Sequence, residues 1–269
     1  MISGVTFEIQ LDQIPEGWEA ARQFHRLKKR LPRAIRELVE ERAIVTIMAR
    51  AQEMLRHARQ PTRLVEVQLP SPGELNLEAT LEKPRPWQAH DIVIEQRQPR
   101  EVEVIAILDM SLSMTGEKIA LTALAAAILR LRLGRLAVVC FDTRAHRLVA
   151  VGEDISVREL IRRILRVPAQ GYTNIEAGLL MSLTELRRSR LTERVGVIMT
   201  DGVANVGMSP VPVAARFPRM HVVQVGLEER NGTRTCVAMA RAGRGRCYRA
   251  QTYEELPGVV RRLVRECFR

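Results

Sequence analysis

One stretch of this sequence, residues 102–114, constrains the fold more than any other. It reads VEVIAILDMSLSM and begins with apolar, mostly β-branched side chains. Such a run is typical of a strand that is buried on both faces of a parallel sheet. The run ends at the carboxylate of Asp109, and the hydroxyls of Ser111 and Ser113 follow at alternate positions. We therefore expect a buried strand that leads into a loop carrying three oxygen donors.

The loop after this strand has two interpretations. It is a polar turn into a helix, with Ser113 or Thr115 as the N-cap, or it is a site at which the three side chains converge on a cation. Carboxylate and hydroxyl oxygens are ligands that Mg²⁺ accepts. Motifs this short often occur by chance, so the loop taken alone favours the turn.

Two later stretches shift the balance toward a cation site. Thr173 precedes an amphipathic helical pattern, and a second apolar run, residues 195–200, ends at Asp201. Ligands of open α/β sheets bind beyond the carboxyl ends of the strands, which is where Asp109 and Asp201 are expected to lie. Thr173 also begins a capping-box pattern with Glu176, so it is a candidate cap as well as a candidate ligand, and Asn174 is an alternative cap.

Taken together, Asp109-x-Ser111-x-Ser113, Thr173 and Thr200-Asp201-Gly202 resemble the metal-ion-dependent adhesion site of von Willebrand factor A (VWA) domains, in the same order and context. The resemblance covers about residues 101–269. It implies a bound Mg²⁺ or Mn²⁺ ion whose ligands are five side chains: Asp109, Ser111, Ser113, Thr173 and Asp201. Bacterial members usually carry Gly where this chain has Leu112. That position is not a ligand, but Leu reduces the backbone freedom of the loop.

Within the VWA proteins, the chain is similar to bacterial CoxE-like proteins and to others that are encoded beside MoxR-type AAA+ ATPases. It is also similar to the D subunit of magnesium chelatase. The segments that carry this likeness are residues 73–81 and 200–206. The resemblance implies an adaptor whose partner is an AAA+ ATPase, since the chain has no ATPase module of its own.

The segments after residue 101 alternate between strand and helix patterns. Helices are expected at residues 117–133, 157–165, 175–186, 211–217, 233–241 and 254–268, and strands at residues 136–141, 147–151, 195–199, 221–227 and 246–250. Such alternation implies right-handed crossovers and helices on both faces of a mostly parallel sheet. The expected fold class is therefore α/β, a doubly wound, Rossmann-like VWA fold. A chain of residues 101–269 should fold by itself.

Residues 1–100 are expected to form an N-terminal extension. Helical patterns occupy about residues 16–57, with a break at Pro32, and the basic run at residues 28–30 is interpreted as a solvated helix end. His25 is interpreted as a half-buried residue of a helix face. From about residue 60 to residue 100, prolines separate short alternating segments, which indicates a β-rich connector that adds edge strands to the main sheet.

Composition limits the class of protein. The 269 residues carry a net charge of +11 with 46% hydrophobic residues, which indicates a globular chain. No apolar run approaches the roughly 20 residues that span a bilayer, and no secretory signal is apparent. The four cysteines lack C-x-x-C spacing, and Cys140 is expected in the core, so a reduced, cytoplasmic protein is the simplest account. The basic excess favours an acidic partner.

Motifs of common enzyme classes are absent from the sequence, including G-x-x-x-x-G-K-[ST], G-x-S-x-G, H-E-x-x-H and G-x-G-x-x-G. Gly116-Glu117-Lys118 has the wrong spacing for a phosphate-binding loop. The favoured hypothesis is therefore a non-enzymatic module that docks an acidic side chain of a partner protein on its metal ion. A nucleic-acid-associated protein is the alternative, disfavoured by the 4% aromatic content. A metal-dependent hydrolase is the third and least favoured hypothesis.

Overall fold

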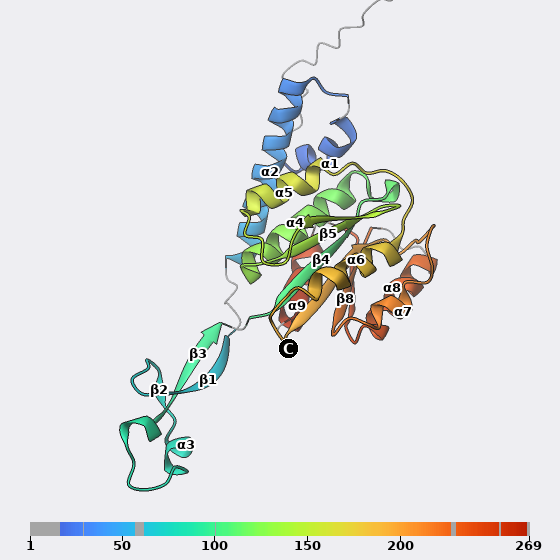
Figure 1. Cartoon of the computed structure of the whole chain (residues 1–269). Coiled ribbons are helices and arrows are strands. Elements are labelled where there is room, and N and C mark those ends of the chain that lie inside the picture. Colours follow the sequence, from blue (N-terminus) through green and yellow to red (C-terminus); the bar gives the residue numbers. More distant parts are fainter. Residues whose placement is uncertain are drawn as a thin grey trace, which may run out of the picture. The chain divides into compact units, whose positions relative to one another are not determined.

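The computed structural model describes residues 17–28, 30–56, 62–99, 101–226, 230–252 and 254–267 of the chain. They form two compact units. The larger unit combines the residues up to 57 with those from 102 onward, and the smaller unit is residues 58–101. The helices that precede residue 57 therefore belong to the same unit as the large sheet (Figure 1).

The larger unit is built on a six-stranded sheet in the order β6-β5-β4-β7-β8-β9. All neighbouring strands are parallel except β5 and β6, which are antiparallel. The doubly wound, mostly parallel α/β fold predicted from the sequence is thus confirmed. The strands are β4 (Glu103–Asp109), β5 (Ala137–Phe141), β6 (Ala145–Val149), β7 (Arg194–Thr200), β8 (Met220–Val225) and β9 (Cys247–Ala250).

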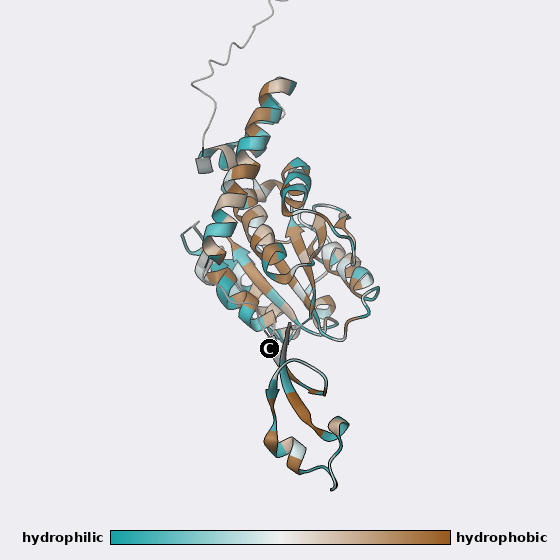
Figure 2. Cartoon of the chain, turned by 90° about the vertical axis from the view of Figure 1, so that its left-hand side faces the viewer, coloured by the Kyte–Doolittle hydropathy of each residue, from teal (hydrophilic) through white to brown (hydrophobic). Residues whose placement is uncertain are grey.

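Helices cover both faces of this sheet (Figure 1). On one face α6 (Ile175–Leu186), α7 (Val211–Ala214) and α8 (Arg230–Ala242) share a hydrophobic core with the strands. On the other face lie α4 (Glu117–Leu133), α5 (Val157–Arg166) and α9 (Leu256–Cys267). The strands are predominantly hydrophobic, and therefore brown, in Figure 2. None of the described helices combines the length and the apolar character that a membrane span requires.

Helix α4 is buried around its whole circumference. Every residue from Ile119 to Arg130 is buried, because the sheet covers one side of the helix and a second layer covers the other. That layer is the pair of helices α1 (Gly17–Leu27) and α2 (Arg33–Leu55), which pack on α4 and α5. The near-uniform apolar pattern of α4 follows from this arrangement. We propose that α1 and α2 belong to the same folding domain as the sheet.

Lys28 joins α1 to the C-terminal end of α5. Its ammonium donates hydrogen bonds to the carbonyl oxygens of Leu165 at 2.8 Å and Val167 at 2.7 Å. His25 Nε2 lies 2.7 Å from the same Val167 oxygen. The last carbonyls of a helix lack partners within the helix, so a nearby cation stabilises them. The prediction of a solvated helix end is therefore wrong for Lys28, which is buried, as is His25; Lys29 lies outside the described residues.

The smaller unit is a three-stranded antiparallel sheet in the order β1-β3-β2. The strands are β1 (Thr62–Gln68), β2 (Glu74–Leu75) and β3 (Val93–Pro99), with the short helices α3 (Leu77–Leu81) and η2 (Ala89–Asp91) between β2 and β3. The prediction that this connector adds edge strands to the main sheet is wrong for the described residues. Strands β1 and β3 pair along seven positions and so satisfy each other's backbone groups.

Candidate functional site

Three loops meet at one edge of the large sheet. Asp109 ends β4, and Asp201 directly follows β7, the parallel neighbour of β4. The third loop carries Thr173 and precedes α6. Its backbone is tied to the other two, since Gln170 N donates to Met110 O at 3.2 Å and Asn205 N donates to Thr173 O at 3.1 Å. The structure thus brings the predicted site residues together from segments that are far apart in the sequence.

Asp109 is fully buried and held by two donors. Its Oδ1 accepts a hydrogen bond from Ser111 N at 3.0 Å, and its Oδ2 accepts one from the Thr200 hydroxyl at 2.6 Å. Burial raises the pKa of Asp109 to about 6, although the hydrogen bonds from Thr200 and Ser111 oppose this shift. The charge of Asp201 raises the pKa further. A carboxylate in this setting would be stabilised by a nearby cation.

Ser111 and Ser113 turn their hydroxyls toward each other, with the two Oγ atoms 3.1 Å apart. Ser111 is buried and Ser113 is exposed, so the pair reaches from the interior to the surface. Neither Ser113 nor Thr115 caps the following helix, and the N-cap prediction is wrong. The N-cap of α4 is Gly116, whose φ of +72° and ψ of −123° favour glycine. The two serine hydroxyls therefore stay at the sheet edge.

Of the two residues that the sequence offered as a cap of the next helix, Asn174 has that role. Asn174 is the N-cap of α6, and its Oδ1 accepts a hydrogen bond from Ala177 N at 3.0 Å. Thr173 is buried as a residue, and no hydrogen bond of its hydroxyl is found among the residues that the structure describes. The hydroxyl is therefore available to a ligand of the site.

Lys118 was not identified from the sequence as part of this site, and Thr200 was quoted in the motif without a role of its own. The Lys118 ammonium lies 3.1 Å from Asp201 Oδ2, while Asp201 Oδ1 accepts a hydrogen bond from Val203 N at 3.2 Å. The Thr200 hydroxyl, besides donating to Asp109, accepts a hydrogen bond from Gly202 N at 3.0 Å. The only signals in the sequence were the positions of Thr200 beside Asp201 and of Lys118 soon after Ser113.

The donor set suits a hard cation. All five candidate ligands (Asp109, Ser111, Ser113, Thr173 and Asp201) offer oxygen, with two carboxylates and three hydroxyls. Within the described ranges of the chain, no group of three or more His, Cys, Asp or Glu side chains is placed to hold a metal ion. Oxygen ligands together with retained waters are the environment that Mg²⁺ prefers, and Mn²⁺ accepts the same donors. The residues present therefore fit the ion that the fold family implies.

Comparisons with solved structures agree on the fold. An aerotolerance-related membrane protein from Bacteroides fragilis is 18% identical, with a TM-score of 0.53 over 62% of this chain and 98% of that one. A von Willebrand factor type A protein from Catenulispora acidiphila is 16% identical, with a TM-score of 0.52 over 65% and 45%. Proximal thread matrix protein 1 from the mussel byssus, with a zinc-occupied metal-ion-dependent adhesion site, is 17% identical, with a TM-score of 0.52 over 61% and 46%.

These identities are low, so the structural neighbours establish the fold alone. No curated protein matches the sequence. A family model, in contrast, matches residues 41–221, which is about two-thirds of the chain, from α2 through the smaller unit to the start of β8. This protein therefore belongs to the family of VWA domain containing CoxE-like proteins.

Proposed function

We propose that this protein is an interaction module that binds a partner protein through a Mg²⁺ ion held by the five candidate ligands. The observation that carries the proposal is the meeting of the three loops, which brings the buried Asp109 carboxylate, the hydroxyl pair of Ser111 and Ser113, and the Thr173 loop to one place. Five side-chain ligands leave at least one position open in the octahedral shell of Mg²⁺. An Asp or Glu side chain of the partner completes this shell.

Among the residues that the structure describes, a histidine and two buried thiols are poorly suited to act as base or nucleophile. Burial lowers the pKa of His221, on β8, to about 4, and its Nδ1 accepts a hydrogen bond from Arg246 N. Burial raises the pKa of the Cys236 and Cys140 thiols, which disfavours the reactive thiolate. VWA proteins are in general interaction modules rather than enzymes, and these environments support the same role here.

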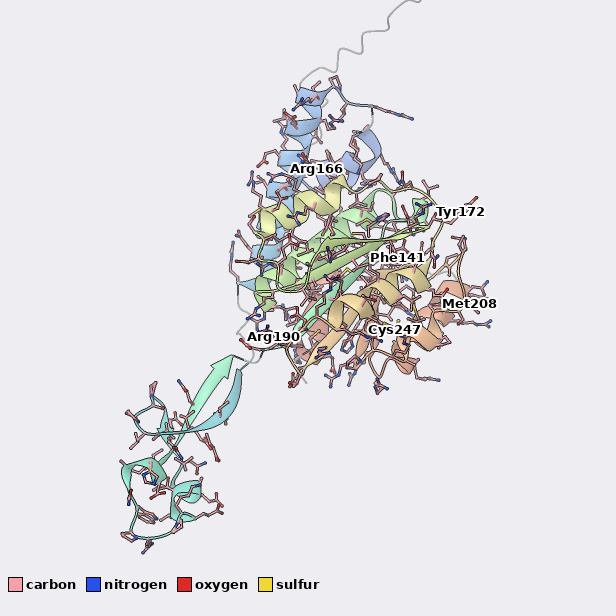
Figure 3. All side chains as sticks on the ribbon, viewed as in Figure 1. Phe141, Arg166, Tyr172, Arg190, Met208 and Cys247 are labelled. Atoms are coloured by element: carbon pink, nitrogen blue, oxygen red, sulfur yellow. The ribbon has the colours of Figure 1, made fainter. Side chains whose placement is uncertain are left out.

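Exposed apolar side chains on the same three loops favour a protein as the partner. Leu112 is 62% exposed, Tyr172 is 65% exposed and Met208 is 76% exposed. Figure 3 shows Tyr172 and Met208 on the same side of the larger unit. The loop of Met208 is tied to α6 by the hydrogen bond from Met208 N to Glu176 at 2.7 Å. We infer that the partner's acidic residue is flanked by apolar side chains that pack on this rim.

We propose a MoxR-type AAA+ ATPase as the partner and the cytoplasm as the compartment, with complex assembly or metal-cofactor maturation as the process. The likeness of residues 73–81 and 200–206 to the ATPase-associated VWA proteins supports this choice. The net charge of +11 favours an acidic surface on the partner.

A pull-down with the MoxR-type ATPase of the same genome tests the proposal. Binding should require Mg²⁺, disappear in EDTA, and return when Mg²⁺ is added in excess. Asp109→Asn should abolish it. Asp142→Asn is the matched control, since Asp142 directly follows the strand β5 but accepts a hydrogen bond from Arg144 N in its own turn. Equal retention in EDTA and by both variants would remove the metal-bridge mechanism.

A further inference from the structure

Lys118 lies where it would oppose a cation at Asp201. Its ammonium is 3.1 Å from Asp201 Oδ2, and the two side chains are 26% and 7% exposed. Both carboxylate oxygens of Asp201 are then engaged, since Val203 N donates to Oδ1. A divalent ion and an ammonium repel each other at such short range, so the two cannot share Asp201 without a large loss of free energy.

A glycine leaves room for the Lys118 side chain. Gly226, at the end of β8, has a φ of +90°, and a Cβ atom at this position would collide with Lys118 Cε. In the position that it takes here, the side chain therefore occupies space that any other residue at position 226 would fill.

A cleft of about 440 Å³ lies between α1 and the start of α4, and Lys118 and Gly226 both line it. Its walls also carry the carboxylates of Glu19 and Glu117. Arg22 lies 3.2 Å from Glu19 and 3.9 Å from Glu117, and Arg26 also lines the cleft. A Lys118 ammonium that left Asp201 would find acidic acceptors in this cleft.

We propose that Lys118 is a tethered competitor for the ion and so sets the ion affinity of the site. Without an ion, its ammonium neutralises Asp201 and relieves the repulsion between Asp201 and Asp109. When the ion binds, the ammonium withdraws toward the cleft beside α1. This inference rests on the proposed ion site and identifies the residue that limits its affinity.

Isothermal titration with MgCl₂ tests the competition without any partner protein. Lys118→Met keeps the apolar stem and removes the ammonium. It should bind Mg²⁺ at least about tenfold more tightly than the parent chain, because the competing charge is gone. Arg26→Met is the matched control. Arg26 lines the same cleft and makes no hydrogen bond or ion pair within the described residues. It removes one positive charge without touching Asp201, so it should change the affinity much less.

A thermal melt in EDTA provides a second readout. Lys118→Met leaves the buried Asp201 carboxylate without its counter-charge, so its melting temperature should fall in EDTA and recover more than that of the parent chain in Mg²⁺. Unchanged or weaker Mg²⁺ binding by Lys118→Met, with normal binding by the parent chain, would overturn the competition and leave the proposed function intact. Binding by neither protein would overturn both.

Discussion

The Thr200 hydroxyl donates a 2.6 Å hydrogen bond to Asp109 Oδ2, and so links the ends of the neighbouring strands β7 and β4. The same oxygen accepts a hydrogen bond from Gly202 N, which starts the turn after Asp201. One side chain therefore orients the buried carboxylate and shapes the loop that carries the second one. Hydrogen bonds within the protein therefore position the two carboxylates without an ion.

Millimolar Mg²⁺ should raise the melting temperature of the protein. An ion that binds only the folded state stabilises it by mass action, by about 2.7 kcal/mol when its concentration is 100 times the Kd. Asp109→Asn should lose the whole effect, whereas Asp142→Asn should keep it. Differential scanning fluorimetry measures both. The same Mg²⁺ shift in Asp109→Asn as in the parent chain would place the ion elsewhere.

Substitutions of Thr173 and Asn174 should have separate effects, one on ion binding and the other on helix capping. Thr173→Val removes the hydroxyl and keeps the shape, so Mg²⁺ affinity should fall by about tenfold or more, as expected for a lost ligand. Asn174→Ala should lower the free energy of unfolding by about 1 kcal/mol, because the α6 cap is lost, with little change in Mg²⁺ affinity. Urea unfolding and calorimetric titration of both variants give the comparison. The reverse pattern would show that Thr173 has a structural role only.

Mg²⁺ binding should weaken as the pH falls through about 6, because only the ionised Asp109 attracts the ion. With a folded pKa of about 6, the affinity at pH 5 should be about tenfold lower than at pH 7. Titrations at several pH values measure this. An affinity that stays constant between pH 5 and pH 7 would exclude Asp109 as the controlling ligand.

In the ion-free protein, the contribution of Asp109 to folding stability should decrease as the pH rises, which is opposite to the pH dependence of Mg²⁺ binding. The folded pKa of Asp109, about 6, lies above the ordinary value of 3.8. Its protonated form therefore stabilises the fold below pH 3.8, and this stabilisation is lost as the pH rises through 6, by about 3 kcal/mol in all. Asp109→Asn carries no charge and should be at least as stable as the parent chain in EDTA at pH 7. Urea unfolding should show that the difference in the free energy of unfolding between the two proteins is smaller at pH 5 than at pH 7.

The smaller unit should be removable. Replacing residues 58–100 by a flexible linker of about 15 residues should leave the larger unit folded and able to bind Mg²⁺, because the sheet and its helices are one compact unit. Residues 101–269 alone should unfold at lower urea, since the face of α4 that α2 covers becomes exposed. Circular dichroism of the two proteins makes the comparison. Equal stability would show that α1 and α2 add nothing to the domain.

Local patterns in the sequence were enough to predict the fold and the order of the candidate ligands. The apolar run into Asp109 and the second run into Asp201 each identify a strand end, since burial on both faces of a sheet requires continuous apolar side chains. Parallel strands that alternate with helices then place both carboxylates at the same edge. The resemblance to VWA domains could be recognised from the sequence motifs alone, without knowing any contact between residues in the structure.

Only the tertiary structure decided which long-range partners these residues have. Lys118 and Asp201 are 83 residues apart, and Lys28 and Leu165 are 137 apart, so no periodic pattern connects either pair. Their contacts depend on how α4 and α1 pack against the rest of the unit. From the sequence alone, a lysine in a helical pattern is expected to be exposed to solvent. The sequence also did not fix which sheet the strands β1 and β3 would join. They pair with each other along seven positions, and this choice of partner is a property of the folded chain and not of either segment.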